Sequence, residues 1–394
     1  MKGVFYLLHD SPARRDDFIS VTGDTLFPLY FCETRWVEDK CVAERLLEIW
    51  ANIVKLVDYY DSLPKYKQPS FKTYIHVKNA VSDPFTKSKL YYFSYIAGLL
   101  QPFLKIYQTD KPMLPFLFDD LKSLVKTLLT NIVDSNILEK SKTTKELLDI
   151  KLDQNNLLKT NDVHIGFAAS SEVRKLLVKD VVTTKQVAVF KKEARTFVIG
   201  ILKKIYTKCP LNSDIVKNST IFNPEKIQTN RGKFLKKKAK LLFQKFVSLN
   251  IIPFTKADKA YIQYCNFIDD DMLLILENAK LFVRGESRID DFFFQDLKVY
   301  KKYPDMSTLL ILILTLSHGQ AEVERGFNNN NLVLKDNMSI DSIVARRFMN
   351  DYMIQKGLHP HEMPITPQLM KSVSSARTRY NVYLEEAKKR ESQK

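Results

Sequence analysis

Apolar residues recur at the spacing of an α-helix along most of this chain. Val42, Leu46 and Trp50 follow one another at intervals of four residues, which places them on one side of a helix. The segment from Thr184 to Tyr206 repeats the pattern and carries lysines on its opposite side. Only 10 of the 394 residues are glycine, so tight turns should be few. These features predict a mainly α-helical fold.

The same spacing, with proline as a boundary signal, divides the chain further. Helices are predicted over residues 37–62, 89–107, 112–132 with an interruption at Pro115, 184–206, 256–282, 341–352 and 367–394. Residues 1–37 are expected to be loop-like, because Asp10-Ser11-Pro12 and Thr22-Gly23-Asp24 are turn signals. The polar stretch 135–161 is interpreted as a surface excursion. A hydrophobic content of 45% is enough for a large core and for two or three structural units.

The charge of the chain points to a polyanionic partner. The formal net charge is +16 and the pI is about 9.4, values that favour nucleic acid. The densest basic run is Arg231–Lys240, followed by Lys245 on the same segment. This run is interpreted first as a solvated helix face, second as a track for a phosphate backbone, and third as a nuclear-import signal. The lysines of the track would be Lys233, Lys236, Lys237, Lys238 and Lys240.

Metal sites, disulfides and membrane spans are not expected. Cys32, Cys41, Cys209 and Cys265 are scattered without a Cys-x-x-Cys pair, which indicates a reducing compartment. Asp269–Asp271 would point in different directions around a helix, and His359–Glu362 lies in a proline-containing loop. The apolar run 309–314 is far shorter than the roughly 20 residues that cross a bilayer. We therefore expect a soluble intracellular protein without a bound metal.

The apolar run 309–314 leads into the stretch Ser317–Phe327, which contains Glu322, Glu324 and Arg325. Ser317 is a weak helix-start signal, and carboxylates in a first turn are favoured by the helix dipole. A structural charge at a helix N-terminus is thus one interpretation of these acids.

A second interpretation comes from a resemblance. Ser317–Phe327, followed by Asn337 and the segment Asp341–Tyr352, resembles the C-terminal block of hAT-superfamily DNA transposases. Glu324 then matches the family's catalytic glutamate, while Asn328 stands where many members carry serine. The resemblance extends from about Ser11 to Tyr352.

The resemblance implies roles for further residues. Arg35 and Trp36 match an Arg-Trp pair at the entry to the family's helical insertion, where the indole stacks on a displaced DNA base. A core anchor with a salt-bridging neighbour is the alternative. Arg325 would also contact DNA. The C-terminal block implies dimerisation, and the candidate contacts are Ile311, Ile313, Ile343 and Phe348.

The resemblance also implies what this sequence lacks. The family's RNase H-like core carries two aspartates on strands before the insertion, and the three carboxylates hold two divalent metals. No such strands precede Arg35, and Asp16, Asp17 and Asp24 lie in sequence expected to be loop-like. One glutamate cannot hold two metals against hydration. We therefore expect no enzymatic activity and no cofactor.

The expected architecture is a helical insertion domain with a C-terminal remnant of a split RNase H-like core. Its parts would be a core remnant (1–37), the insertion (38–300), the dimerisation region (301–358) and a charged helical tail (359–394). The expected protein is nuclear, binds DNA and forms a homo-oligomer through an apolar surface that the missing sheet leaves uncovered. Two alternatives stay open: a nuclease subunit completed in trans, which would need Mg²⁺, and a helical interaction scaffold without a DNA role.

Overall fold

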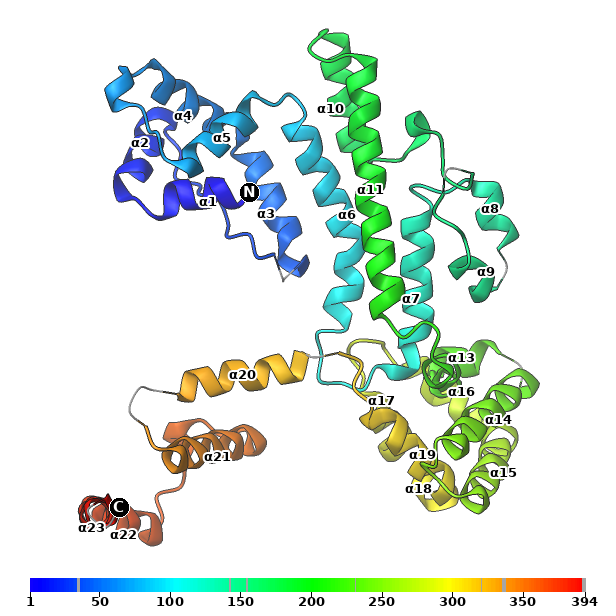
Figure 1. Ribbon diagram of the computed structural model, residues 1–394. Helices are drawn as coiled ribbons and strands as arrows, with labels where there is room; N and C mark the ends of the chain where they lie inside the picture. Colours follow the sequence, from blue (N-terminus) through cyan, green and yellow to red (C-terminus); the bar gives the residue numbers. More distant parts are fainter. Residues whose placement is uncertain are drawn as a thin grey trace. The chain divides into compact units, whose positions relative to one another are not determined.

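The structure is a computed structural model that describes residues 1–33, 36–141, 143–153, 155–230, 232–319, 321–334 and 338–391. These residues form helices and no strand (Figure 1), so the expected mainly α-helical fold is confirmed. The chain divides into two compact units, unit 1 (Met1–Ala321) and unit 2 (Glu322–Lys394). This division lies about 20 residues after the boundary expected at 300/301, since the last helices before it pack into unit 1.

The first helices of unit 1 occupy sequence that was expected to be loop-like. Helix α1 spans Lys2–His9 and α2 spans Pro12–Thr22. The side chain of Ser11 accepts a hydrogen bond from the backbone N–H of Arg14, and Pro12 begins the helix. Gly23 ends it in the left-handed conformation, with φ of 70°. The expectation was wrong because these serine, proline and glycine signals are helix boundaries.

Three more helices complete the N-terminal part of unit 1. The predicted helix 37–62 is two helices, α3 (Trp36–Glu48) and α4 (Trp50–Ser62), which meet at Ile49. Helix α4 ends before Pro64 as predicted, and α5 (Lys72–Ser82) was not predicted. A separate hydrophobic core joins α1, α2, α4 and α5, and its fully buried members include Leu7, Phe18, Ile53 and Leu56.

Long helices form the middle of unit 1 (Figure 1). They are α6 (Thr86–Ile106), α7 (Leu114–Leu129), α10 (Phe167–Val178) and α11 (Thr184–Lys208). The predicted helices 89–107, 112–132 and 184–206 are confirmed within a few residues. Pro115 lies in the first turn of α7 and does not interrupt it, because a first-turn proline has no hydrogen bond to lose. The short helices α8 (Ser135–Lys140) and α9 (Thr144–Leu148) lie in the polar stretch 135–161.

The remaining helices of unit 1 are α12 (Asp214–Ser219), α13 (Pro224–Thr229), α14 (Gly232–Ser248), α15 (Phe254–Asp270), α16 (Met272–Leu281), α17 (Ile289–Asp291), α18 (Val299–Lys302) and α19 (Pro304–Thr315). The predicted helix 256–282 is interrupted at Asp271, between α15 and α16. The carboxylate of Asp271 accepts from Lys302 Nζ and from Tyr303 Oη, each at 2.8 Å. The break therefore lies where a side chain is held by a neighbouring element.

Helix α19 corrects the expectation of an uncovered apolar surface. It contains the run 309–314, and it packs against α15, α18 and α7. Leu309, Leu310 and Ile313 are at most 2% exposed, while Ile311 is 50% exposed. The helices of unit 1 thus bury most of this run within one chain, which removes the stated reason for self-association through it.

Unit 2 contains α20 from its second residue onward (Ala321–Val333), α21 (Ile340–Lys356), α22 (Pro367–Ser374) and α23 (Ala376–Glu391). Among its described side chains only Val333 is buried, at 6% exposure. The predicted helix 341–352 is confirmed within a few residues, and the predicted helix 367–394 is divided between α22 and α23. The described residues of unit 2 therefore form helices with almost no hydrophobic core.

Candidate nucleic-acid interface

Helix α14 presents the densest basic run of the chain. Its buried side is formed by Leu235, Ala239, Leu242, Phe243 and Phe246, each at most 2% exposed. These positions repeat at helical spacing, so the lysines between them lie off the buried side of the helix. The predicted helix and its amphipathic character are therefore confirmed.

Three lysines of α14 form one exposed row, which we call the lysine stripe: Lys233, Lys237 and Lys240. Their spacing of four and three residues places them on the same side of the helix, over about 10 Å of its length. No ion pair or hydrogen bond of these three ammonium groups is found within the part of the chain that the structure describes. Among the described residues, the lysine stripe is thus a row of cations without ion-pair partners.

The other lysines of the predicted track are held by the protein itself. The ammonium group of Lys236 lies 2.5 Å from both carboxylate oxygens of Asp269 on α15. Lys238 Nζ donates to the hydroxyl of Thr220 at 2.8 Å and is partly buried. Burial lowers the pKa of Lys238; Asp119 opposes this shift, and nearby lysines add to it. Lys236 and Lys238 are therefore less available to an external anion than the lysine stripe is.

A hollow of about 580 Å³ lies between α14 and α15, next to the lysine stripe. Its lining includes Lys240, Phe243, Gln244, Val247, Ser248, Asn250, Phe254, Ala257, Asp258 and Tyr261. Phe254 is 74% exposed, whereas Phe243 is buried. Lys240 belongs both to the lysine stripe and to this hollow, so the two features are continuous.

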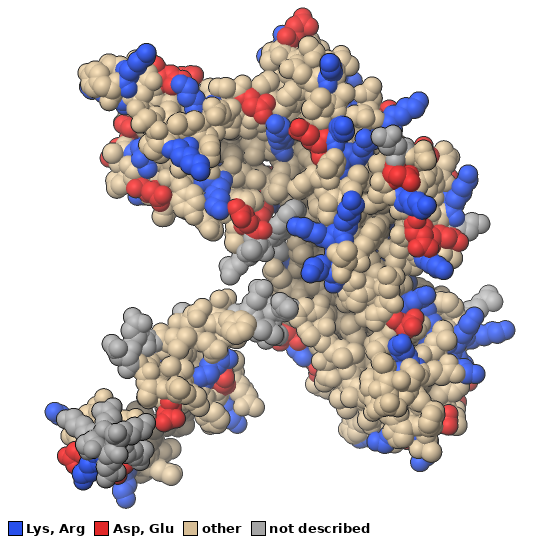
Figure 2. Space-filling model, in the orientation of Figure 1, with Lys and Arg blue, Asp and Glu red and all other residues tan. Residues whose placement is uncertain are grey.

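Helix α11 is a second basic surface that sequence reasoning did not select. It carries Lys185, Lys191, Lys192, Arg195, Lys203, Lys204 and Lys208 against a single acid, Glu193. Figure 2 shows basic side chains gathered over the α11 region and around α13 and α14. The sequence places lysines on one side of this helix, but they are spread along it and form no dense run, so they were not selected as a site.

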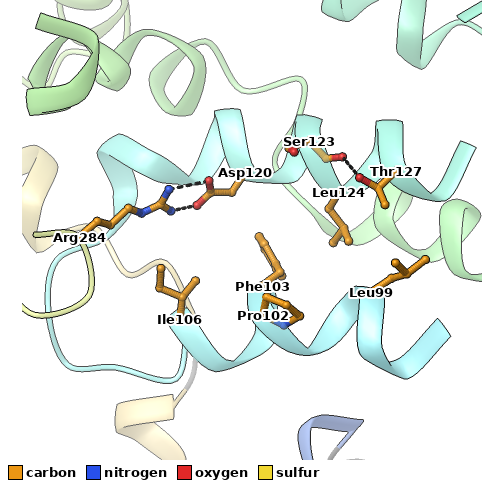
Figure 3. Close-up of a pocket in the computed structure, with 9 residues that line it drawn as sticks. All are labelled: Leu99, Pro102, Phe103, Ile106, Asp120, Ser123, Leu124, Thr127 and Arg284. Atoms are coloured by element: carbon orange, nitrogen blue, oxygen red, sulfur yellow. Dashed lines mark hydrogen bonds and ion pairs between the residues drawn. The ribbon is translucent and has the colours of Figure 1, made fainter. Parts of the chain in front are cut away.

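A groove between α6 and α7 has a different character (Figure 3). Its volume is about 260 Å³, and it is lined by Leu99, Pro102, Phe103, Ile106, Asp120, Ser123, Leu124, Thr127 and Arg284. The guanidinium of Arg284 makes two bonds to the carboxylate of Asp120, one of them at 2.9 Å, and lies over the ring of Phe116. Tyr107 Oη also donates to Asp120, at 2.6 Å. This pair attaches the segment before α17 to α7, and the groove is smaller than usual ligand pockets.

Several sequence-predicted site residues lie outside what the structure describes. The structure does not describe residue Arg35. It also does not describe the side chains of Trp36, Glu324 and Arg325. The predicted stacking and catalytic positions therefore remain predictions.

The acids that were set aside as catalytic groups have structural partners. Asp17 accepts from Tyr60 Oη at 2.9 Å, and Asp24 accepts from the side-chain amide of Asn52 at 2.7 Å. Asp269 on α15 pairs with α14, and Asp271, at the break after α15, pairs with α18, so these two carboxylates have separate partners. Within the described ranges, no three His, Cys, Asp or Glu side chains come together to hold a metal ion.

The candidate dimerisation residues differ in accessibility. Phe348 is 73% exposed, Ile311 is 50% exposed and Ile343 is partly buried. Ile313 is fully buried in the core of unit 1, so its selection as an intermolecular contact was wrong. Sequence reasoning chose it because it read the apolar run as lacking an internal partner.

None of the described helices is both long enough and apolar enough to cross a membrane. Comparisons with protein-family models, with curated proteins and with solved structures give no match for this chain.

Proposed function

We propose that this protein binds DNA through the lysine stripe of α14. The observation that carries the proposal is the row Lys233, Lys237 and Lys240, exposed on one side of a helix and without counter-charges among the described residues. The net charge of +16 adds a long-range attraction for a polyanion. Lysines that are not neutralised internally can replace the counterions of a phosphate backbone, and the released counterions favour binding.

Such binding should be independent of sequence. We expect dissociation constants of about 10⁻⁴ to 10⁻⁶ M at physiological salt, the range of non-specific DNA binding. Fluorescence anisotropy with a labelled duplex, titrated at several salt concentrations, tests this. Affinity that falls steeply with salt and does not depend on sequence is expected. Absence of binding at low salt would favour a helical interaction scaffold without a DNA role.

A second function, self-association, is supported by unit 2. Ile340, Val344 and Phe348 lie at intervals of four residues along α21 and are 78%, 60% and 73% exposed. A unit with one buried described side chain gains little from hydrophobic burial, and a second copy of the chain would supply the missing cover. The resemblance of Asp341–Tyr352 to a dimerisation region points the same way. Light scattering of the purified chain tests this proposal, and a stable monomer at micromolar concentration would contradict it.

The wider proposal is a nuclear, non-catalytic protein derived from a hAT transposase, with a remnant of its RNase H-like core. It rests on the resemblance of Ser317–Phe327, in which Glu324 matches the catalytic glutamate. The test is incubation of the pure chain with nicked and hairpin DNA in Mg²⁺ or Mn²⁺. Cleavage that Glu324→Gln abolishes would refute the non-catalytic assignment. Cleavage that appears only after addition of a different chain that carries the two missing aspartates would support completion of the active site in trans.

A further inference from the structure

The hollow between α14 and α15 combines an apolar interior with a polar rim. Phe243, Val247, Ala257 and Tyr261 supply apolar surface inside it, and Phe254 stands exposed at its edge. Gln244, Ser248 and Asn250 bring hydrogen-bonding groups to the rim. At about 580 Å³ the hollow has the volume of ordinary small-ligand pockets, which span about 300 to 1,000 Å³.

The polar rim is fixed by the backbone on both sides. Helix α14 ends at Ser248, and Asn250 just beyond it adopts a left-handed conformation with φ of 56°, while the N–H of Ile251 donates to the carbonyl of Phe246 at 3.0 Å. Ile252 is buried and anchors the connection to α15. Phe254 occupies the first turn of α15, after Pro253. The groups around the hollow are therefore placed by helix ends and not by a long loop.

The charges around the hollow favour a phosphate group at one position and a base at another. Lys240 lies where the lysine stripe meets the hollow, so a phosphate that it binds would be adjacent to the opening. Asp258 lines the hollow itself, and its carboxylate would repel a phosphate there but accept a hydrogen bond from the amino group of a base. A strand whose phosphates follow the lysine stripe would thus present a base, and not a phosphate, to the hollow.

We propose that this hollow receives an unpaired base of single-stranded DNA, stacked on Phe254, while the lysine stripe holds the adjoining phosphates. The inference rests on the proposed DNA binding and specifies its preferred substrate. A duplex keeps the faces of its bases stacked on one another, so only an unpaired base can offer its face to an aromatic side chain. The protein should therefore prefer single strands to duplexes of the same length.

The test is fluorescence anisotropy of the full chain with a labelled single strand and with the matching duplex. Phe254→Ala should weaken single-strand binding by at least about fivefold, the lower end of the effect of losing one stacked base, and leave duplex binding unchanged. Because Phe254 is 74% exposed, its truncation removes little core packing. The matched control is Phe167→Ala, at a phenylalanine that is 87% exposed on α10, outside the hollow. This control should change neither affinity.

Phe254→Trp provides a direct readout. Tryptophan retains the stacking surface, so single-strand affinity should be preserved, and added single strand should quench the new indole beyond any change in the parent protein, which has two tryptophans. Equal effects of Phe254→Ala on single strand and duplex, or no effect on either, would overturn the inference. In that case, if neutralising the lysine stripe still weakens the binding of both single strand and duplex, the proposed DNA binding stands although the base-stacking inference fails. If the parent chain binds neither form at low salt, the proposed function itself fails.

Discussion

Neutralising the lysine stripe should change the salt dependence of DNA binding by a calculable amount. The variant is Lys233→Gln, Lys237→Gln and Lys240→Gln together, which removes three exposed charges without touching the buried side of α14. If each lysine neutralises one phosphate, the slope of log K against log salt should become less steep by about 2.7 for a duplex and about 2.1 for a single strand. Between about 50 and 200 mM salt, the parent should lose about 40-fold more duplex affinity than the variant does.

The assay is fluorescence anisotropy over a series of salt concentrations, with circular dichroism to verify that helix content is unchanged. The matched control removes the same charge elsewhere, at the exposed residues Lys55, Lys65 and Lys67 of the N-terminal helices. If only the net charge of the protein mattered, the stripe variant and the control variant would change the slope of log K against log salt by similar small amounts. A slope that is unchanged in the stripe variant, or that falls equally in the control, would refute the assignment of the phosphate track to α14.

Four further predictions concern stability, assembly and activity. Arg284→Met should lower the free energy of unfolding by about 3 kcal/mol in urea titrations, because it leaves the largely buried carboxylate of Asp120 without a counter-charge and with only the hydrogen bond from Tyr107; adding Asp120→Leu should recover most of the loss. Phe348→Asp should reduce the mass measured by light scattering, since this side chain is 73% exposed and open to a second chain; an unchanged mass would exclude this surface as the contact. Under the proposed non-catalytic function, neither the parent chain nor Glu324→Gln should cleave DNA with Mg²⁺ in gel assays, and cleavage by the parent chain that Glu324→Gln abolishes would contradict it. Lys238→Met should raise Tm at pH 7, because burial lowers the pKa of this lysine and its charged form therefore opposes folding; the gain should disappear as pH rises through that lowered pKa toward the ordinary lysine range.

The sequence determined the helices because their signals are local. Apolar residues at helical spacing identified α6 and α11, and Pro64 marked the end of α4. A local signal gave a wrong prediction where the same residues can begin either a helix or a turn. Ser11-Pro12 begins a helix here, although serine and proline also begin turns.

The tertiary structure decided which of these residues are available. The five lysines of the predicted track are alike in sequence, but Asp269 on another helix neutralises Lys236, and the hydroxyl of Thr220 accepts a hydrogen bond from Lys238. The apolar run in α19 predicted an uncovered surface, but other helices of unit 1 cover Ile313. The hollow between α14 and α15 exists only once the two helices pack together. Charge and periodicity belong to the sequence, whereas ion pairing, burial and cavities depend on contacts between residues far apart in the chain, which no local pattern specifies.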